Sequence, residues 1–437
     1  MRGCVRVLVA AAVAIGSVAV IRPPAGAAEA PNTAVWAASS YVNVFKDDVP
    51  AVNADRAIKL VVARNEFEAA QVMIRKDREF TVSGVDLPDL TGPAGTIPAK
   101  NLSYHFLDYV HLNHNSVFGG NQPVDNVVHK APGDFPDALS NDRTRTVPAN
   151  TTQPIWIRSY IPKQTAPGTY AGTVTIHTDS GDSQVPISLQ VEKVTIPDAQ
   201  DSSFTTALWM TNFGPLSWDV GKGDTIKLFY GWDRYSPQWW QLMGHFAQAM
   251  KDYRNNDLPV PIVSLLLDGG SSLDAGGTYH FDWSRFDQVV DYFLQHGAVK
   301  RLEGFWMSGD AFGKQEWQTE LIGRDGNGQP VRTYAASDSQ QVVDWVKQFV
   351  PALKAHIQAK GWAGKWWMHV GDEPSNARHV ASYKAMAGQI RAQWPDVRLG
   401  DAIFDQNTAT QLDEQQDILI PNELALDPNP DYYEQQR

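Results

Sequence analysis

The sequence predicts a multidomain protein of the β plus α/β class, with an N-terminal β-sandwich followed by a (β/α)8 barrel. Three observations support this prediction. At 437 residues the chain is too long for one ordinary hydrophobic core. Up to about residue 199, short apolar runs alternate with Gly, Pro and Asp turns, whereas strand-like and helical segments alternate from residue 200 onward. We therefore expect a leader at residues 1–30 and domains at residues 31–199 and 200–437.

The first thirty residues have the pattern of a secretory signal peptide. Arg2 and Arg6 precede an apolar run at residues 7–21, and small residues at 25–28 offer a cleavage site. The run is shorter than the roughly 20 residues that a spanning helix needs, so we expect a secreted protein with no membrane association after cleavage. The only cysteine, Cys4, lies in this leader, so the mature chain should have neither a disulfide nor a thiol nucleophile.

The predicted N-terminal domain consists of short strands separated by turns. Its runs show no helical period, which favours a β-sandwich. Proline-rich residues 86–98 and 132–148 are predicted to be long loops, and residues 196–199 a linker. The predicted strands include residues 58–62, 70–74, 154–161, 172–176 and 185–191.

The predicted C-terminal domain repeats a strand-then-helix rhythm, whose number and spacing favour a barrel over a doubly wound sheet. A closed barrel needs two more strand–helix units, roughly 60 residues, so we expect the barrel to be truncated at its C-terminus. Its six predicted strands are residues 204–209, 260–267, 301–307, 366–370, 397–402 and 418–421. The helical faces between them are Trp240, Met243, Ala247 and Met250; Phe286, Val289, Val290 and Phe293; Val343, Val346, Val350, Leu353 and Ile357; and Val380, Tyr383, Ala387 and Ile390.

Composition and charge limit the classes of partner. The chain carries 37 basic and 49 acidic residues, a net charge of −12. Cleavage after Ala30 would remove Arg2, Arg6, Arg22 and Glu29 and leave 34 − 48 = −14. An acidic chain without basic runs is unsuited to nucleic acid or anionic membranes, so we expect neither partner. Fifteen Trp, 14 Tyr and 17 Phe suit a sugar-binding cleft or a large core, and the oligomeric state is left open.

Residues 366–374, WWMHVGDEP, end a predicted strand with two adjacent carboxylates, Asp372 and Glu373. Barrel enzymes carry their chemistry at the C-terminal ends of the strands. Gly371 loosens this strand end so that both acids can tilt toward the opening, and Pro374 fixes where the chain leaves. These two residues are therefore the candidate catalytic pair. The alternative is an acidic turn that caps the next helix.

Adjacent acids do not suit the usual two-carboxylate glycosidase, whose carboxyl groups lie roughly 5 to 9 Å apart across the scissile bond. They suit a substrate-assisted reaction, in which one acid protonates the leaving oxygen while the sugar's own 2-acetamido carbonyl attacks the anomeric carbon. The neighbouring acid then stabilises the positive oxazolinium. Two alternatives remain: a two-acid glycosidase on non-acetamido sugars, using Glu303 and Glu373, and a non-catalytic carbohydrate-binding surface protein.

The sequence resembles glycoside hydrolase family 123 over essentially the whole mature chain. The most specific motif is HVGDEP at residues 369–374. The resemblance implies an N-terminal β-sandwich and a retaining exo-β-N-acetylgalactosaminidase, with Glu373 as general acid/base and Asp372 as the acetamido-orienting carboxylate. Val370-Gly371 replaces the family's common Ile-Ser, and residues 305–309 lack an expected histidine, which leaves the sugar open. The other supporting motifs are ARNEFEAAQ (63–71), GDFPDAL (133–139), APGTYAG (166–172) and FDWSRFD (281–287).

The remaining candidate substrate-binding residues are His369, Trp306, Trp209 and Glu303. His369 is expected to orient a carboxylate or a hydroxyl group, with a role as a metal ligand as the alternative. The two tryptophans are candidates for stacking on a sugar ring, with core packing as the alternative.

No metal or other cofactor is expected. His111 and His114 have a spacing seen in metal sites, but no third ligand accompanies them in the sequence.

Overall fold

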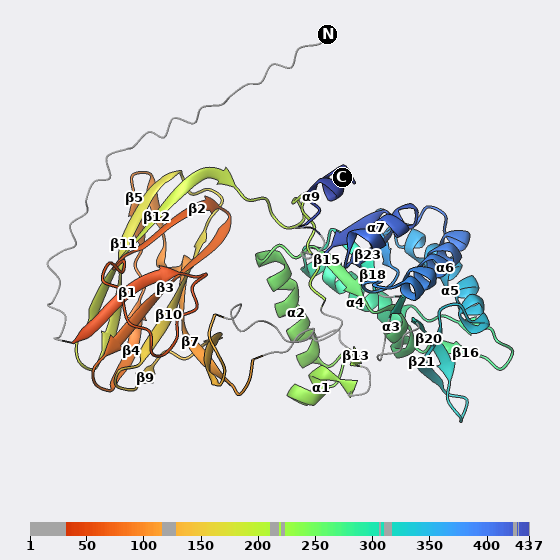
Figure 1. The fold of residues 1–437 in the computed structure, drawn as a ribbon, viewed down its shortest axis with the longest axis horizontal. Coiled ribbons are helices and arrows are strands. Elements are labelled where there is room, and N and C mark those ends of the chain that lie inside the picture. The colour runs from red at the N-terminus through yellow and green to blue at the C-terminus, as the bar shows by residue number, and fades with distance from the viewer. Residues whose placement is uncertain are drawn as a thin grey trace, which may run out of the picture. The chain divides into compact units, whose positions relative to one another are not determined.

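The computed structural model describes residues 32–115, 128–209, 218–219, 223–305, 307–309, 317–422, 426 and 428–436. The predicted leader at residues 1–30 lies outside the described residues. The chain divides into two compact units, Met1–Ile196 and Pro197–Arg437 (Figure 1). Each unit has its own hydrophobic core.

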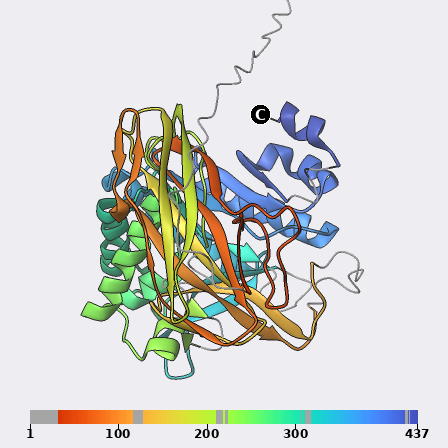
Figure 2. The same cartoon turned by 90° about the vertical axis from the view of Figure 1, so that its left-hand side faces the viewer.

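The first unit consists of two β-sheets whose inward side chains form one buried cluster, which confirms the predicted β-rich N-terminal domain. Long neighbouring strands such as β11 and β12 run side by side (Figure 2). One sheet has the order β1 (Thr33–Ser39), β3 (Glu66–Lys76), β10 (Thr152–Ile161), β7 (Leu102–Leu112) and β8 (Gly133–Ser140). The other has the order β2 (Ile58–Arg64), β12 (Ser183–Thr195), β11 (Gly168–Thr178), β4 (Phe80–Asp86) and β9 (Arg145–Val147), with β5 (Leu90–Gly92) and β6 (Gly95–Ile97) beside β11.

Strand β12 shows why these residues form a sandwich. Val185, Ile187, Leu189 and Val191 are buried, and the residues between them are partly exposed. This period of two places every second side chain in the core. The proline-rich segments predicted as loops contain strands β5, β6, β8 and β9 instead. Pro136 is accommodated in β8 because this strand lies at the edge of its sheet.

The second unit is built on a parallel sheet in which each strand lies next to its successor in the chain. The strand order is β15 (Asp257–Val260), β18 (Arg301–Gly304), β22 (Trp366–His369), β23 (Leu399–Ile403) and β24 (Ile418–Pro421). The helices are α1 (Thr225–Tyr230), α2 (Pro237–Asp252), α3 (Ile262–Gly269), α4 (Ser284–His296), α5 (Gln340–Ala359), α6 (Ala377–Gln393), α7 (Gln406–Leu412) and α9 (Pro430–Gln435). Small antiparallel sheets pair β13 (Trp218–Asp219) with β14 (Gly223–Asp224), β16 (Ser272–Leu273) with β17 (Tyr279–His280), and β19 (Ser308–Gly309) with β20 (Gln318–Arg324) and β21 (Pro330–Ala336).

The predicted closed barrel and its truncation are not confirmed. In the described part of the chain, the parallel strands form an open row of five, with β15 and β24 at its ends. Residues 204–209, predicted as the first strand, contribute one parallel bridge, between Ala207 and Asp257.

The strand predicted at residues 260–267 is wrong. Strand β15 ends at Val260, and Ile262–Gly269 forms helix α3, which ends at Gly270 in the left-handed conformation. The first five residues of this helix are all buried, so this apolar run shows no polar face. A short apolar run without a polar face cannot be told from a buried strand by its periodicity.

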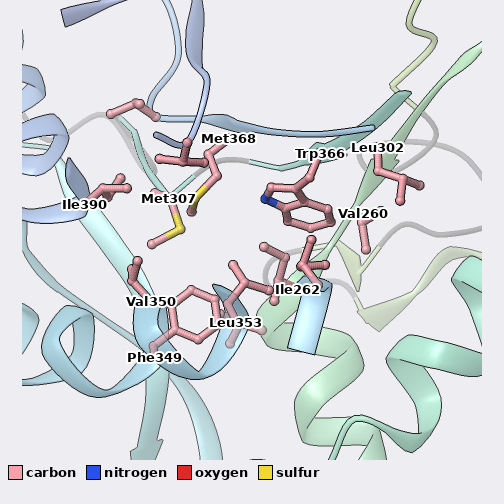
Figure 3. Packing of buried hydrophobic residues seen from close by; sticks show 14 of the residues in the cluster. Val260, Ile262, Leu302, Met307, Phe349, Val350, Leu353, Trp366, Met368 and Ile390 are labelled. Atoms are coloured by element: carbon pink, nitrogen blue, oxygen red, sulfur yellow. The ribbon is translucent and has the colours of Figure 1, made fainter. Parts of the chain in front are cut away.

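Strand β22 packs one of its faces against the helices. Trp366 and Met368 lie among the side chains of β15, β18, α5 and α6 (Figure 3). The predicted apolar faces of α2, α4, α5 and α6 are almost entirely buried in the same core. Because side chains alternate along a strand, Trp367 and His369 are left for the opposite face of the sheet.

Candidate active site

The opposite face of the parallel sheet carries a buried ion-pair network. Nδ1 of His369 on β22 lies 2.6 Å from Oε1 of Glu303 on β18. Its Nε2 lies 3.4 Å from Oδ1 of Asp401 on β23. All three side chains are at most 1% exposed. One imidazole therefore bridges carboxylates from the two neighbouring strands.

The two carboxylates keep the imidazole of His369 charged. Burial alone would lower the pKa of His369, but the bonds and charges of Asp401 and Glu303 raise it to about 10. His369 is therefore an imidazolium at neutral pH, and its charge offsets part of the cost of burying two carboxylates.

Asp401 connects this network to the turn that follows β22. Its Oδ2 accepts a hydrogen bond of 2.9 Å from the backbone N–H of Gly371, and the carboxylate also accepts one from the backbone N–H of Glu373. Sequence reasoning did not single out Asp401. The signal was an acid inside the otherwise apolar strand LGDAI.

Asp372 and Glu373 occupy this turn, and both are partly exposed. Glu373 has a φ of 47°, a left-handed conformation that costs energy for a residue other than glycine. Burial raises the pKa of Asp372 to about 7. The negative charges of Asp401 and Glu373 also raise it, whereas the positive charge of His369 lowers it. A strained backbone at Glu373 beside a raised pKa at Asp372 marks this turn as the candidate chemical centre.

The acidic pair does not cap the helix that follows it. Helix α6 begins at Ala377, and its cap is Asn376, whose side chain accepts hydrogen bonds from the backbone N–H groups of Arg378 and His379. Because Asn376 performs this role, the cap alternative does not explain Asp372 and Glu373.

Gly371 permits a close ring contact at the base of the turn. A Cβ at this position would lie 2.2 Å from a ring atom of Trp317, which is itself buried. Any larger residue would displace the ring or the turn. The glycine that departs from the common family motif is therefore matched to Trp317 in this chain.

Trp209, one of the two tryptophan candidates, lies beside the buried network. The ring centroid of Trp209 lies 5.6 Å from that of His369 and 5.4 Å from that of Phe305. Trp209 is partly exposed, so it borders the buried network. Trp306 lies outside the described residues. The structure thus brings His369, Glu303 and Trp209 together.

Asp257 is a second acid that sequence reasoning missed. It opens β15, is 2% exposed, and its Oδ2 accepts a 2.9 Å hydrogen bond from Nε1 of Trp367. Burial and the nearby charge of Glu303 raise the pKa of Asp257 to about 7.

Asp257→Asn is expected to gain stability relative to the wild type as the pH rises. The pKa of Asp257 is about 7 in the folded protein and has an ordinary value of 3.8. Between about pH 4 and pH 7 the unfolded chain therefore loses this proton while the folded protein keeps it, and the wild type becomes less stable as the pH rises. The difference in unfolding free energy between variant and wild type should therefore move by roughly 2 kcal/mol in favour of the variant between pH 5 and pH 8, as measured by urea unfolding. Asp396→Asn, at a side chain that is 80% exposed, should show no such change. An equal difference at both pH values for Asp257→Asn would contradict the burial argument.

Two models of one protein family match this chain. A model of the glycoside hydrolase 123 catalytic domain matches residues 221–436, and a model of the glycoside hydrolase 123 N-terminal domain matches residues 38–178. Together they cover more than half of the chain. The chain belongs to glycoside hydrolase family 123. It therefore carries a glycoside hydrolase domain, for which the class of substrate is carbohydrate.

One solved structure of a family 123 protein agrees with the fold of this chain. The structure of a family 123 glycoside hydrolase from Clostridium perfringens, studied for glycolipid glycan hydrolysis, matches with a TM-score of 0.69 at 14% identity, covering 90% of this chain and 68% of that chain. At this identity the match shows the fold alone. An exo β-N-acetylglucosaminidase of family 20 from Vibrio harveyi gives a TM-score of 0.23 at 8% identity, covering 89% of this chain and 81% of that chain, which is too low to support an argument. Comparison with curated protein sequences gave no match.

The geometry separates the carboxylates of this family 123 domain by their access to a sugar. Asp372 and Glu373 are partly exposed in the turn, whereas Glu303 is buried and forms an ion pair with His369. Glu303 and His369 are therefore placed to support the turn rather than to contact a substrate.

The described ranges contain neither a group of side chains suited to a metal ion nor a helix suited to span a membrane. His111 lies 2.8 Å from Asp134, and no group of three or more His, Cys, Asp or Glu side chains in those ranges could hold a metal ion. Within the same ranges, no helix combines the length and apolar character needed to cross a membrane.

Proposed function

We propose that this family 123 glycoside hydrolase cleaves β-linked N-acetylhexosaminides, with N-acetylgalactosamine favoured, by retaining substrate-assisted catalysis. The observation that carries the proposal is the adjacent, partly exposed pair Asp372 and Glu373 at the end of β22. Two neighbouring acids cannot stand on opposite sides of a glycosidic bond, as the two-carboxylate mechanism requires. A nucleophile supplied by the sugar removes that requirement.

The two acids have different roles in this proposal. Glu373 is the general acid that protonates the leaving oxygen and then the base that activates water. Asp372 accepts the N–H of the 2-acetamido group and stabilises the oxazolinium. The raised pKa of Asp372 supports this role, since a carboxylate in a poorly solvated site gains most from a cation that forms beside it.

We also propose the location and the kind of substrate. The solved family 123 protein from Clostridium perfringens was studied for hydrolysis of glycolipid glycans, and we propose a glycan of that kind for this chain. The leader pattern at residues 1–30 supports secretion.

A panel of aryl β-glycosides tests the proposal on the whole chain. We expect turnover of 2-acetamido sugars, fastest for N-acetylgalactosamine, and potent inhibition by a thiazoline that mimics the oxazolinium. Turnover of sugars without the acetamido group, unaffected by the thiazoline, would instead support the two-acid mechanism with Glu303 and Glu373. Glycan binding without any turnover would support a non-catalytic carbohydrate-binding protein.

A further inference from the structure

Asp401 contacts both the buried ion pair and the backbone of the acidic turn. One carboxylate oxygen faces Nε2 of His369 at 3.4 Å, and the other accepts the N–H of Gly371 at 2.9 Å. The backbone N–H of Glu373 also donates to this carboxylate. Asp401 has no exposed surface, so it cannot itself contact a substrate.

The turn needs these bonds to keep its shape. Glu373 holds a left-handed φ of 47°, which costs of order 1–3 kcal/mol for a residue with a side chain and persists only where surrounding contacts enforce it. Gly371 is buried, so its N–H would be left unsatisfied without Asp401. One carboxylate therefore satisfies the backbone of the turn on both sides of Asp372.

Burial raises the pKa of Asp401, while His369 and the backbone N–H groups of Gly371 and Glu373 act in the opposite direction and favour its charged form. His369 on β22 faces it as an imidazolium, and Glu303 on β18 holds the other side of that ring. Tyr383 on α6 also lies within its electrostatic reach, as does Asp372 in the turn. The charged groups that act on Asp372 are in turn Asp401, His369 and Glu373.

We infer that Asp401 is a positioning residue for the acidic pair: it fixes the turn through the backbone of Gly371 and Glu373, and its negative charge, paired with His369, acts on Asp372 across that turn. The inference rests on the proposed function for its kinetic readout. Its geometric part, the anchoring of the turn, is independent of that function.

Asp401→Asn tests the electrostatic part on the whole enzyme. Asparagine keeps an acceptor oxygen but loses the negative charge that helps to raise the pKa of Asp372. Because Asp372 must be ionised to stabilise the oxazolinium, activity falls below its pKa. The acid limb of kcat/KM against pH should therefore shift by about one unit to lower pH in the variant. Asp257→Asn is the matched control: Asp257 is a buried acid whose pKa is also raised, but its carboxylate bonds to Trp367, and its variant should leave the limb in place.

Asp401→Ala tests the positioning part. Removing both amide contacts should lower kcat by about 10²-fold with a smaller effect on KM, because misplacing a catalytic group by about 1 Å has a cost of that order. Asp401→Glu should restore part of kcat by returning an acceptor and a charge. Thermal unfolding of each variant establishes that it is folded.

The crystal structure of Asp401→Ala separates a failure of this inference from a failure of the proposed function. We expect Glu373 to leave the left-handed conformation, or the turn to change its path, while β22 keeps its register. An unchanged turn would overturn the positioning role, even if the wild-type chain hydrolysed none of the glycosides. An acid limb that stays in place in Asp401→Asn, or that shifts equally in Asp257→Asn, would overturn the electrostatic role.

Discussion

Replacing Glu373 with glutamine is expected to lower kcat/KM by about 10²–10⁴-fold on β-N-acetylhexosaminides whose leaving group must be protonated. Glutamine has nearly the same shape but carries no transferable proton. The loss should therefore shrink on substrates with a nitrophenol or fluoride leaving group, which departs without a proton. Steady-state kinetics on a series of leaving groups of falling pKa measures this trend.

Glu414→Gln is the matched control for this variant. Glu414 is an exposed glutamate on the short helix Asp413–Gln415, so the same change of atoms there should leave the kinetics unchanged. If Glu373→Gln turned over every substrate at the wild-type rate, Glu373 would not be the proton donor, and its strained backbone would need another explanation. A loss that is equal for all leaving groups would also exclude that role.

The features that can be recognised from local pattern were predictable from the sequence. Helices α4, α5 and α6 each carry an apolar face of period 3.6, and β12 alternates with period two. The turn containing Asp372 and Glu373 follows directly from a run of apolar residues interrupted by Gly, two acids and Pro. Helix α3 was missed because its first five residues are all buried, so they show no polar face that would set a helical period.

The buried network could not be read from the sequence, because it depends on the register of three parallel strands. Glu303 and His369 are 66 residues apart, and Gly371 and Asp401 are 30 residues apart. Each contact requires knowing which residue of one strand lies beside which residue of the next, and a single sequence does not contain that register. For the same reason Glu303, chosen as a partner for Glu373, is found bonded to His369.

The acidic turn also has a local feature that composition does not reveal. Glu373 adopts a conformation that is rarely predicted for glutamate, and it does so where Asp401 can accept its backbone N–H. Because Glu373 has this left-handed backbone and Asp372 does not, the two residues differ in conformation although they are neighbours in the sequence. Their roles should therefore separate in kinetics.

Replacing Asp372 with asparagine is expected to lower kcat by about 10²–10³-fold, with the same loss for good and poor leaving groups. The proton donor is intact in this variant, but the charge that stabilises the oxazolinium is gone. Because the positive charge develops whichever group departs, an activated leaving group cannot compensate. The acid limb of the pH profile that reflects Asp372, with its pKa of about 7, should also disappear.

The comparison with Glu373→Gln decides between the mechanisms. Measured on the same series of leaving groups, Glu373→Gln should recover with activation while Asp372→Asn should not. Weaker binding of the thiazoline to Asp372→Asn than to the wild type would follow from the same lost charge. If activated leaving groups rescued both variants equally, Asp372 would not be the carboxylate that orients the acetamido group. If the wild type hydrolysed sugars without the acetamido group as fast as their 2-acetamido counterparts, the sugar would not supply the nucleophile, and the substrate-assisted route would be rejected.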